Sequence, residues 1–64
     1  MDIQARYLNE RQVAEITGRS VFTLRNDRAK GQGIRYVKVT DRQVRYSLKD
    51  IVDFMEARKI ETQN

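Results

Sequence analysis

The sequence predicts a small α+β fold, mostly helical with one β-hairpin, in a single domain spanning residues 1–64. A chain of 64 residues can bury only one modest core, which indicates one domain. Apolar residues recur at helical spacing in three stretches and alternate in a fourth, which is typical of three helices and a hairpin. The chain has no proline, and its three glycines fall between these stretches. The expected order is helix, helix, strand, strand, helix.

The first helix is expected over residues 10–17. Asn9 is a good N-cap, and Gln12 stands three residues later, as in a capping box. The buried stripe is expected to comprise Val13, Ile16 and Ala14. Gly18 can adopt the left-handed conformation that ends a helix, so the helix should stop before it.

The second helix is expected over residues 21–30, with Ser20 as its N-cap and Gly31 just beyond its end. Its apolar face is thin and consists of Val21, Leu24 and Ala29. Its polar face carries Arg25, Asn26 and Arg28. A helix with so little to bury belongs on the surface of the domain, where a partner can use its exposed side.

A β-hairpin is expected over residues 34–46, with a four-residue loop at 40–43. Alternation gives it an apolar face made of Val37, Val39, Val44 and Tyr46. Its polar face carries Lys38 and Arg45. Because an isolated hairpin is marginal in water, the apolar face is expected to pack on the helices.

The third helix is expected over residues 48–60, capped by Ser47 with Asp50 three residues later. Its apolar stripe comprises Leu48, Ile51, Val52, Phe54 and Met55. This stripe is the widest of the three, so this helix should supply most of the core. Residues 61–64 are expected to fray.

Positive charge is concentrated in the middle of the chain. The whole chain carries 13 Lys and Arg against 9 Asp and Glu, for a net charge of +4. Between Arg19 and Tyr46 there are eight basic residues, and only Asp27 and Asp41 oppose them. A cluster of this kind suits a polyanion such as DNA, because each neutralised phosphate releases condensed counterions. A basic surface that is merely solvated remains the alternative.

Composition argues against several other classes of protein. There is no cysteine, no histidine and no glycine-rich phosphate loop, so we expect neither an enzyme nor a site for a metal, cofactor or small-molecule ligand. No apolar run approaches the roughly 18 residues of a membrane span. The first residues do not resemble a signal peptide. We therefore expect a cytoplasmic protein.

Helix, glycine turn and short second helix is the order of a helix-turn-helix. Residues 13–24 supply the side chains that this motif requires. Ala14 is small where two helices approach, Gly18 provides the turn, and Leu24 can anchor the inner face of the second helix. Glycine between helices is common, so this match alone is only moderately specific.

Three segments give the sequence a more specific resemblance. They are Tyr7-Leu8-Asn9-Glu10 leading into Val13-Ala14, Thr23-Leu24-Arg25-Asn26-Asp27-Arg28, and Tyr36-Val37-Lys38-Val39 with Val44-Arg45-Tyr46-Ser47-Leu48-Lys49-Asp50. From about residue 7 to residue 60 the chain resembles the small excisionases and AlpA-type regulators, which share a MerR-like winged helix-turn-helix. Arg19 and Asp27 depart from the pattern, since apolar residues are usual at both positions. We expect both to weaken the packing of the second helix, with Asp27 pairing to Arg28, Lys30 or a hairpin residue.

The resemblance implies that the second helix enters the major groove of DNA and that the hairpin acts as a wing. The implied contacts in the recognition helix are Ser20, Val21, Phe22, Thr23, Arg25, Asn26 and Arg28. Those in the wing are Lys38, Arg42, Gln43 and Arg45.

Chemistry assigns roles within this set. Arg25 can read guanine, Asn26 adenine, and Val21 or Phe22 a thymine methyl. Ser20 and Thr23 can bond phosphate or base. Arg42 suits a narrow minor groove, and phosphate contacts are expected from Arg28, Lys38 and Arg45. The alternatives are core packing for Val21, packing on the wing for Phe22, and plain solvation for Asn26 and the wing cations.

The resemblance implies sequence-specific binding to double-stranded DNA, and therefore association with the nucleoid of a bacterial host cell. The expected role is that of an excisionase, which bends attachment-site DNA for a phage or mobile element. An integrase or recombinase and further copies of the chain are the expected partners. An AlpA-like transcriptional regulator uses the same surface and is the first alternative. A small phage protein that binds and inhibits a host protein is an alternative of another class.

Overall fold

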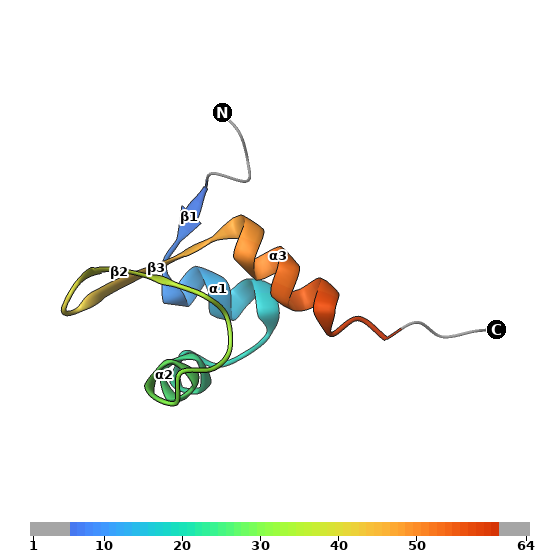
Figure 1. Ribbon diagram of the computed structural model, residues 1–64, viewed down its shortest axis with the longest axis horizontal. Helices are drawn as coiled ribbons and strands as arrows, with labels where there is room; N and C mark the ends of the chain where they lie inside the picture. The colour runs from blue at the N-terminus through green and yellow to red at the C-terminus, as the bar shows by residue number, and fades with distance from the viewer. Residues whose placement is uncertain (1–5, 61–64) are drawn as a thin grey trace.

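The computed structural model describes residues 6–60 and contains three helices and one three-stranded antiparallel sheet (Figure 1). The elements are β1 (Tyr7–Leu8), α1 (Glu10–Thr17), α2 (Val21–Ala29), β2 (Val37–Thr40), β3 (Gln43–Ser47) and α3 (Leu48–Ala57). The sheet order is β1-β3-β2. The α+β class and the order helix, helix, strand, strand, helix are confirmed, whereas strand β1 was not predicted. Within residues 6–60, no helix has the length and hydropathy to cross a membrane.

The helices begin where local capping chemistry places them. At α1 the Asn9 side chain accepts a bond from the Gln12 backbone N–H at 2.9 Å, and the Gln12 side chain accepts one from the Asn9 N–H at 2.9 Å. Gly18 ends α1 with a φ of 73°. Ser20 and Ser47 cap α2 and α3 as predicted. These starts follow from the sequence because every bond involved spans three residues.

Helices α2 and α3 end earlier than predicted, whereas α1 ends at Thr17 as predicted. Helix α2 stops at Ala29, and α3 stops at Ala57 rather than near residue 60. The guanidinium of Arg58 lies 3.6 Å from the centre of the Phe54 ring and donates to the Phe54 carbonyl oxygen at 3.2 Å. Beyond this stacked arginine, Ile60 is 86% exposed. Continuing the helix would have buried nothing, so packing gives no reason for it to extend.

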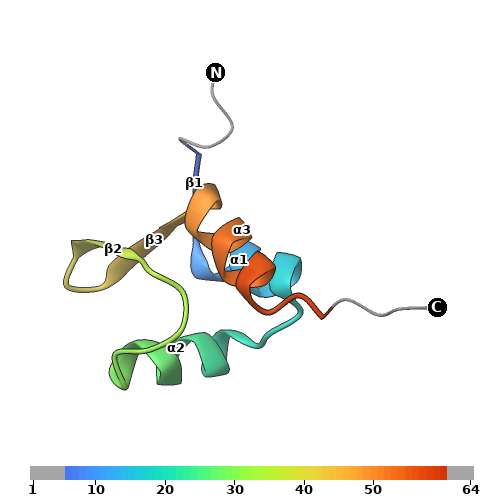
Figure 2. The same ribbon diagram turned by 45° about the vertical axis from the view of Figure 1, so that its right-hand side comes forward.

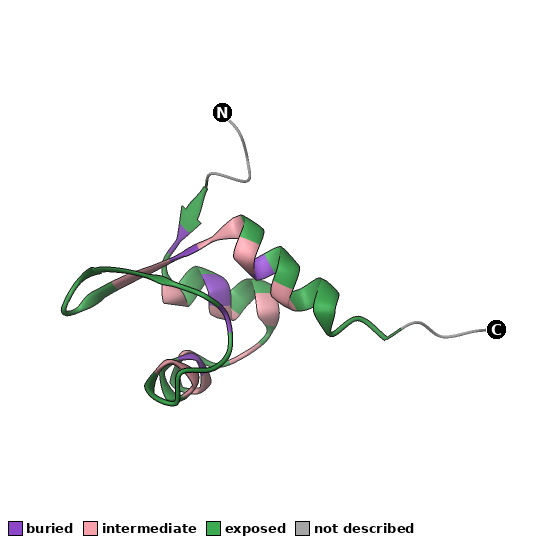
Figure 3. Ribbon diagram, in the orientation of Figure 1, coloured by how far each residue is buried: buried purple, intermediate pink, exposed green. Residues whose placement is uncertain are grey.

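The core takes one buried residue from almost every element (Figure 3). Its members are Leu8, Val13, Leu24, Ile34, Tyr46 and Ile51. Ala14, Val44, Leu48 and Phe54 are partly buried against it. Strand β1 contributes Leu8 to the core, and Leu8 pairs with Tyr46 of the central strand.

The predicted core is too wide in several places. Helix α3 buries only Ile51 fully, while Val52 and Met55 are exposed, so it does not supply most of the core. Ile16 in α1 and Ala29 in α2 are also exposed, contrary to prediction. A three-stranded sheet and three short helices cover only a narrow stripe on each partner, which leaves the flanking apolar positions in water.

The apolar face predicted for the hairpin of β2 and β3 is wrong. Val37 and Val39 are 47% and 55% exposed. Val37 lies opposite Arg45, and Lys38 lies opposite Val44. Opposite residues of an antiparallel pair share one face, so the core-facing side carries Lys38 beside Val44 and not Val37.

The same register separates the two cations that were predicted to share a face, Lys38 and Arg45. The pairing is irregular between Lys38 and Thr40, where the register shifts. The strands are joined through Asp41 and Arg42, a shorter connection than the four residues predicted. Alternation within each strand does not reveal how two strands align, and this is why the predicted faces were wrong.

The two departures from the family pattern pair with each other. The Arg19 guanidinium donates to the Asp27 carboxylate, which also accepts a bond from the Gln32 side chain at 3.3 Å. Arg19 lies 5.6 Å above the Phe54 ring. The predicted partners of Asp27 were therefore wrong, because the two residues that were expected to weaken the packing of α2 form an ion pair with each other.

Gly33 allows the chain to pass close to Asp27. A Cβ atom at Gly33 would lie 2.8 Å from the Asp27 Cβ, and the φ of Gly33 is 88°. Only glycine adopts this conformation at this separation without strain. The Asp27 side chain thus contacts both the turn before α2 and the segment after it.

Candidate nucleic-acid interface

A groove of about 770 Å³ lies between the start of α1, helix α2 and the β2–β3 hairpin. Figure 2 shows α2 running beneath the hairpin, with the segment that connects α2 to β2 at one side. Six basic residues line the groove, namely Arg11, Arg25, Arg28, Lys38, Arg42 and Arg45. The acidic residues of the lining are Glu10 and Asp41. We call this feature the basic groove; its excess of positive charge suits a polyanion.

The outer face of α2 is formed by residues at helical spacing opposite the buried Leu24. Phe22 is 72% exposed, and the Arg25 side chain is 61% exposed. Asn26 is exposed on the same face. An aromatic ring, a guanidinium and a carboxamide therefore face outward together, and each can contact a base edge.

Ser20 and Thr23 are engaged in starting the helix. The Ser20 hydroxyl accepts a bond from the Thr23 backbone N–H at 3.0 Å and lies 2.9 Å from the Thr23 hydroxyl. Val21 and Thr23 are half-buried, whereas Ser20 is exposed. Of these three residues, Ser20 is the one most open to a ligand.

Glu10 connects the two predicted arginines of α2. The Arg25 Nη2 donates to Glu10 Oε1 at 2.6 Å, and Arg25 Nε lies 3.2 and 3.3 Å from the two carboxylate oxygens. Arg28 Nη2 donates to Glu10 Oε2 at 3.1 Å. One carboxylate thus holds two guanidinium groups at the edge of the basic groove.

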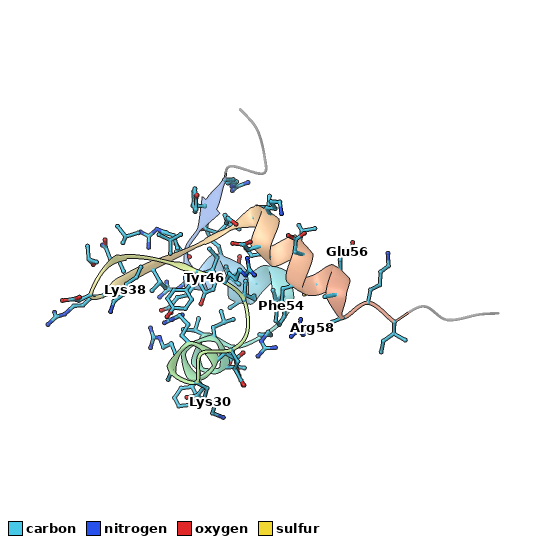
Figure 4. The ribbon with its side chains drawn as sticks, in the orientation of Figure 1. Lys30, Lys38, Tyr46, Phe54, Glu56 and Arg58 are labelled. Carbon is cyan, nitrogen blue, oxygen red and sulfur yellow. The ribbon has the colours of Figure 1, made fainter. Side chains whose placement is uncertain are left out.

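Arg28 is tied to the core rather than turned outward. Its Nη1 donates to the hydroxyl of the buried Tyr46 at 2.7 Å, and its guanidinium lies 5.8 Å from the centre of the Tyr36 ring. The Arg28 side chain is only 17% exposed. Figure 4 shows Tyr46 between the hairpin and α2 and Lys38 on the hairpin. Arg28 therefore has less freedom to follow a phosphate than its place in the sequence indicated.

The predicted hairpin residues all line the basic groove. Lys38, Arg42 and Gln43 are exposed. Arg45 is half-buried, and its Nη1 donates to the Val44 carbonyl oxygen at 2.7 Å. Arg42 stands in the turn, where its backbone N–H donates to the Thr40 hydroxyl at 3.2 Å. Lys38, Arg42 and Gln43 are thus more accessible than Arg45.

The contact between Glu10 and the arginines predicts a pH dependence of stability. Hydrogen bonds from Arg25 lower the pKa of Glu10 below its ordinary value of 4.5, against partial burial, and Arg28 adds to the effect. A lowered carboxyl pKa stabilises the fold above pH 4.5, and this stabilisation is lost as the pH falls through the folded pKa.

Denaturant unfolding of the wild type and Glu10→Gln over a pH series measures this contribution. Above pH 4.5 the wild type should have a larger free energy of unfolding than Glu10→Gln, and this difference should shrink on acidification. A difference that stays constant across the series would mean that the carboxylate charge contributes nothing.

The structure divides the eleven predicted site residues into two groups. The residues that line the basic groove are Arg25, Arg28, Lys38, Arg42, Gln43 and Arg45. Those outside its lining are the N-cap Ser20 and, within α2, Val21, Phe22, Thr23 and Asn26. Glu10, Arg11 and Tyr36 line the groove but were not predicted as site residues. Of these three residues, only Glu10 has a local feature that could have drawn attention to it, namely an acidic side chain in the first turn of α1. No protein-family model, curated protein or solved structure matches this chain significantly.

Proposed function

We propose that this chain is a sequence-specific binding module for double-stranded DNA with a winged helix-turn-helix architecture. In this proposal α2 is the recognition helix and the β2–β3 hairpin is the wing. The observation that carries it is the basic groove, which is lined by six cationic side chains from α1, from α2 and from the hairpin. No other feature of the described residues gathers so much charge of one sign beside side chains suited to base edges.

The proposed complex assigns a role to each part of the surface. An α-helix fits the major groove of B-DNA, so Phe22, Arg25 and Asn26 would meet base edges there. The sugar-phosphate backbone beside that groove would lie in the basic groove, in reach of Lys38. Arg42, at the exposed hairpin tip, would enter the adjacent minor groove, whose negative potential favours arginine.

The biological role proposed rests on the sequence resemblance. It is that of an excisionase that binds attachment-site DNA, with a recombinase and further copies of the chain as partners. Regulation of transcription through the same surface is the alternative. Footprinting separates the two: direct repeats near an attachment site support excision, and a single site over a promoter supports regulation.

A salt titration tests the proposed DNA contact of the hairpin. The logarithm of the binding constant should fall linearly with the logarithm of salt concentration, because bound phosphates release counterions. Arg42→Ala and Arg45→Ala should each reduce that slope by about one unit.

The control for this titration is Lys49→Ala, which removes the same charge from α3, outside the basic groove. It should leave the slope unchanged. If the Arg42 and Arg45 variants keep the wild-type slope, the hairpin lies outside the interface. If no duplex is bound at low salt, the proposed function is wrong.

A further inference from the structure

A continuous set of hydrogen bonds runs from the core to the outer face of α2. It begins at the hydroxyl of Tyr46, a residue that is 1% exposed, and passes through Arg28 and the Glu10 carboxylate to Arg25. The four residues come from β3, α2 and α1, so the set forms only when the tertiary structure is complete. Arg28 is bonded at both Nη atoms, which fixes the second oxygen of Glu10.

Glu10 holds Arg25 by one edge of the guanidinium. The bonds use Arg25 Nε and Nη2. A guanidinium has five N–H donors, so the end formed by Nη1 and the second hydrogen of Nη2 keeps donors for another acceptor. The Arg25 side chain remains 61% exposed despite these bonds. Its end can therefore meet the O6 and N7 atoms of a guanine while Glu10 stays bound.

From this geometry we infer that Glu10 and Arg28 are positioning residues that hold Arg25 for reading one guanine, and that Tyr46 anchors them. The inference rests on the proposed DNA-binding function. A free arginine loses rotamer freedom when it bonds a base, whereas a side chain already held loses less. The fixed orientation also penalises a wrong base, because the guanidinium cannot swing to another acceptor.

The charge of Glu10 makes the effect measurable. A carboxylate in the basic groove opposes phosphate binding on every DNA sequence, so it reduces affinity without regard to sequence. A positioning carboxylate also raises the preference for one base pair. Glu10→Gln should therefore separate the two quantities, because it removes the charge and leaves an amide that cannot accept from both arginines with the same strength.

The experiment begins with a random duplex library, from which the wild type selects a consensus site. Binding constants are then measured for that site, for its three substitutions at each base pair, and for a random duplex. We expect the wild type to prefer guanine at one position by about tenfold to a hundredfold. Glu10→Gln should lower that preference by about tenfold while binding the random duplex at least as tightly.

Two further variants test the arrangement. Tyr46→Phe removes only the hydroxyl, keeps the packed ring, and should lower the same preference by about threefold to fivefold. Glu15→Gln removes an equal charge from the exposed side of α1 and should leave the preference unchanged. Thermal unfolding confirms that each variant folds, and because Glu10→Gln leaves the core untouched, it provides the test even if Tyr46→Phe is unstable.

The outcomes distinguish the inference from the proposed function. If the wild type selects no sequence, the proposed function fails before any variant is compared. If it selects a site and Glu10→Gln keeps the full preference, the positioning role is wrong. If Glu10→Gln binds all duplexes more tightly by the same factor, the Glu10 carboxylate only repels phosphate and does not position Arg25. A loss of preference in Glu15→Gln would also overturn the inference.

Discussion

Replacing Leu24 with alanine is expected to lower the free energy of unfolding by about 2–5 kcal/mol, the usual cost of a buried leucine. Leu24 is 2% exposed and is the one fully buried residue of α2. Domains of this size have a total stability of roughly 3–10 kcal/mol. The substitution should therefore remove a large part of the stability, and the midpoint of urea denaturation followed by circular dichroism should fall markedly.

The matched control on the same helix is Phe22→Ala. Phe22 is 72% exposed, so its replacement should leave the free energy of unfolding within about 0.5 kcal/mol of the wild type. On the proposed function it should still weaken binding to the selected DNA site. Equal destabilisation by the two substitutions would show that α2 does not pack through Leu24 as described.

The second large effect is expected from Arg25→Ala. On the selected duplex its affinity should fall by about tenfold to a hundredfold, because a bidentate contact to guanine is lost. On random duplexes the loss should be smaller, because there only the general attraction of one cation is removed. Fluorescence anisotropy on both duplexes at one fixed salt concentration measures the two losses.

Lys30→Ala is the control for charge. Lys30 caps the C-terminal end of α2 and does not line the basic groove, so its removal changes the net charge equally without touching the proposed contact. We expect it to lower both affinities only slightly. Equal losses of Arg25→Ala on the selected and random duplexes would assign Arg25 to a phosphate and remove it from base reading.

The starts of the helices could be predicted because their determinants are local. The Asn9–Gln12 capping box and the caps at Ser20 and Ser47 depend on side chains three residues apart. The left-handed turn at Gly18 depends on one residue. The range of α1 was predicted to the residue for the same reason. The free energy of a hydrogen bond within one helical turn depends on the residues of that turn, so these bonds can be predicted without the rest of the chain.

Alignment of the strands could not be predicted in this way. The side of β2 that faces the core depends on its register with β3 and on the register shift after Lys38, and the alternation of residues within β2 reveals neither of them. Strand β1 has two residues, too few for a pattern, and forms only because β3 offers it a partner. The width of the core likewise depends on how much surface the neighbouring elements cover.

The candidate site shows the same division. Composition and spacing alone were enough to indicate a basic surface centred on α2 and the hairpin, since charge and helical period are properties of the sequence. The partners of these charges come from far along the chain: Glu10 lies 15 residues from Arg25, and Tyr46 lies 18 residues from Arg28. The pairing of Arg19 with Asp27 likewise depends on how the turn folds back on α2. Ion pairs form between groups that the fold brings within a few ångströms, so only the tertiary structure decided which arginines are held and which are free.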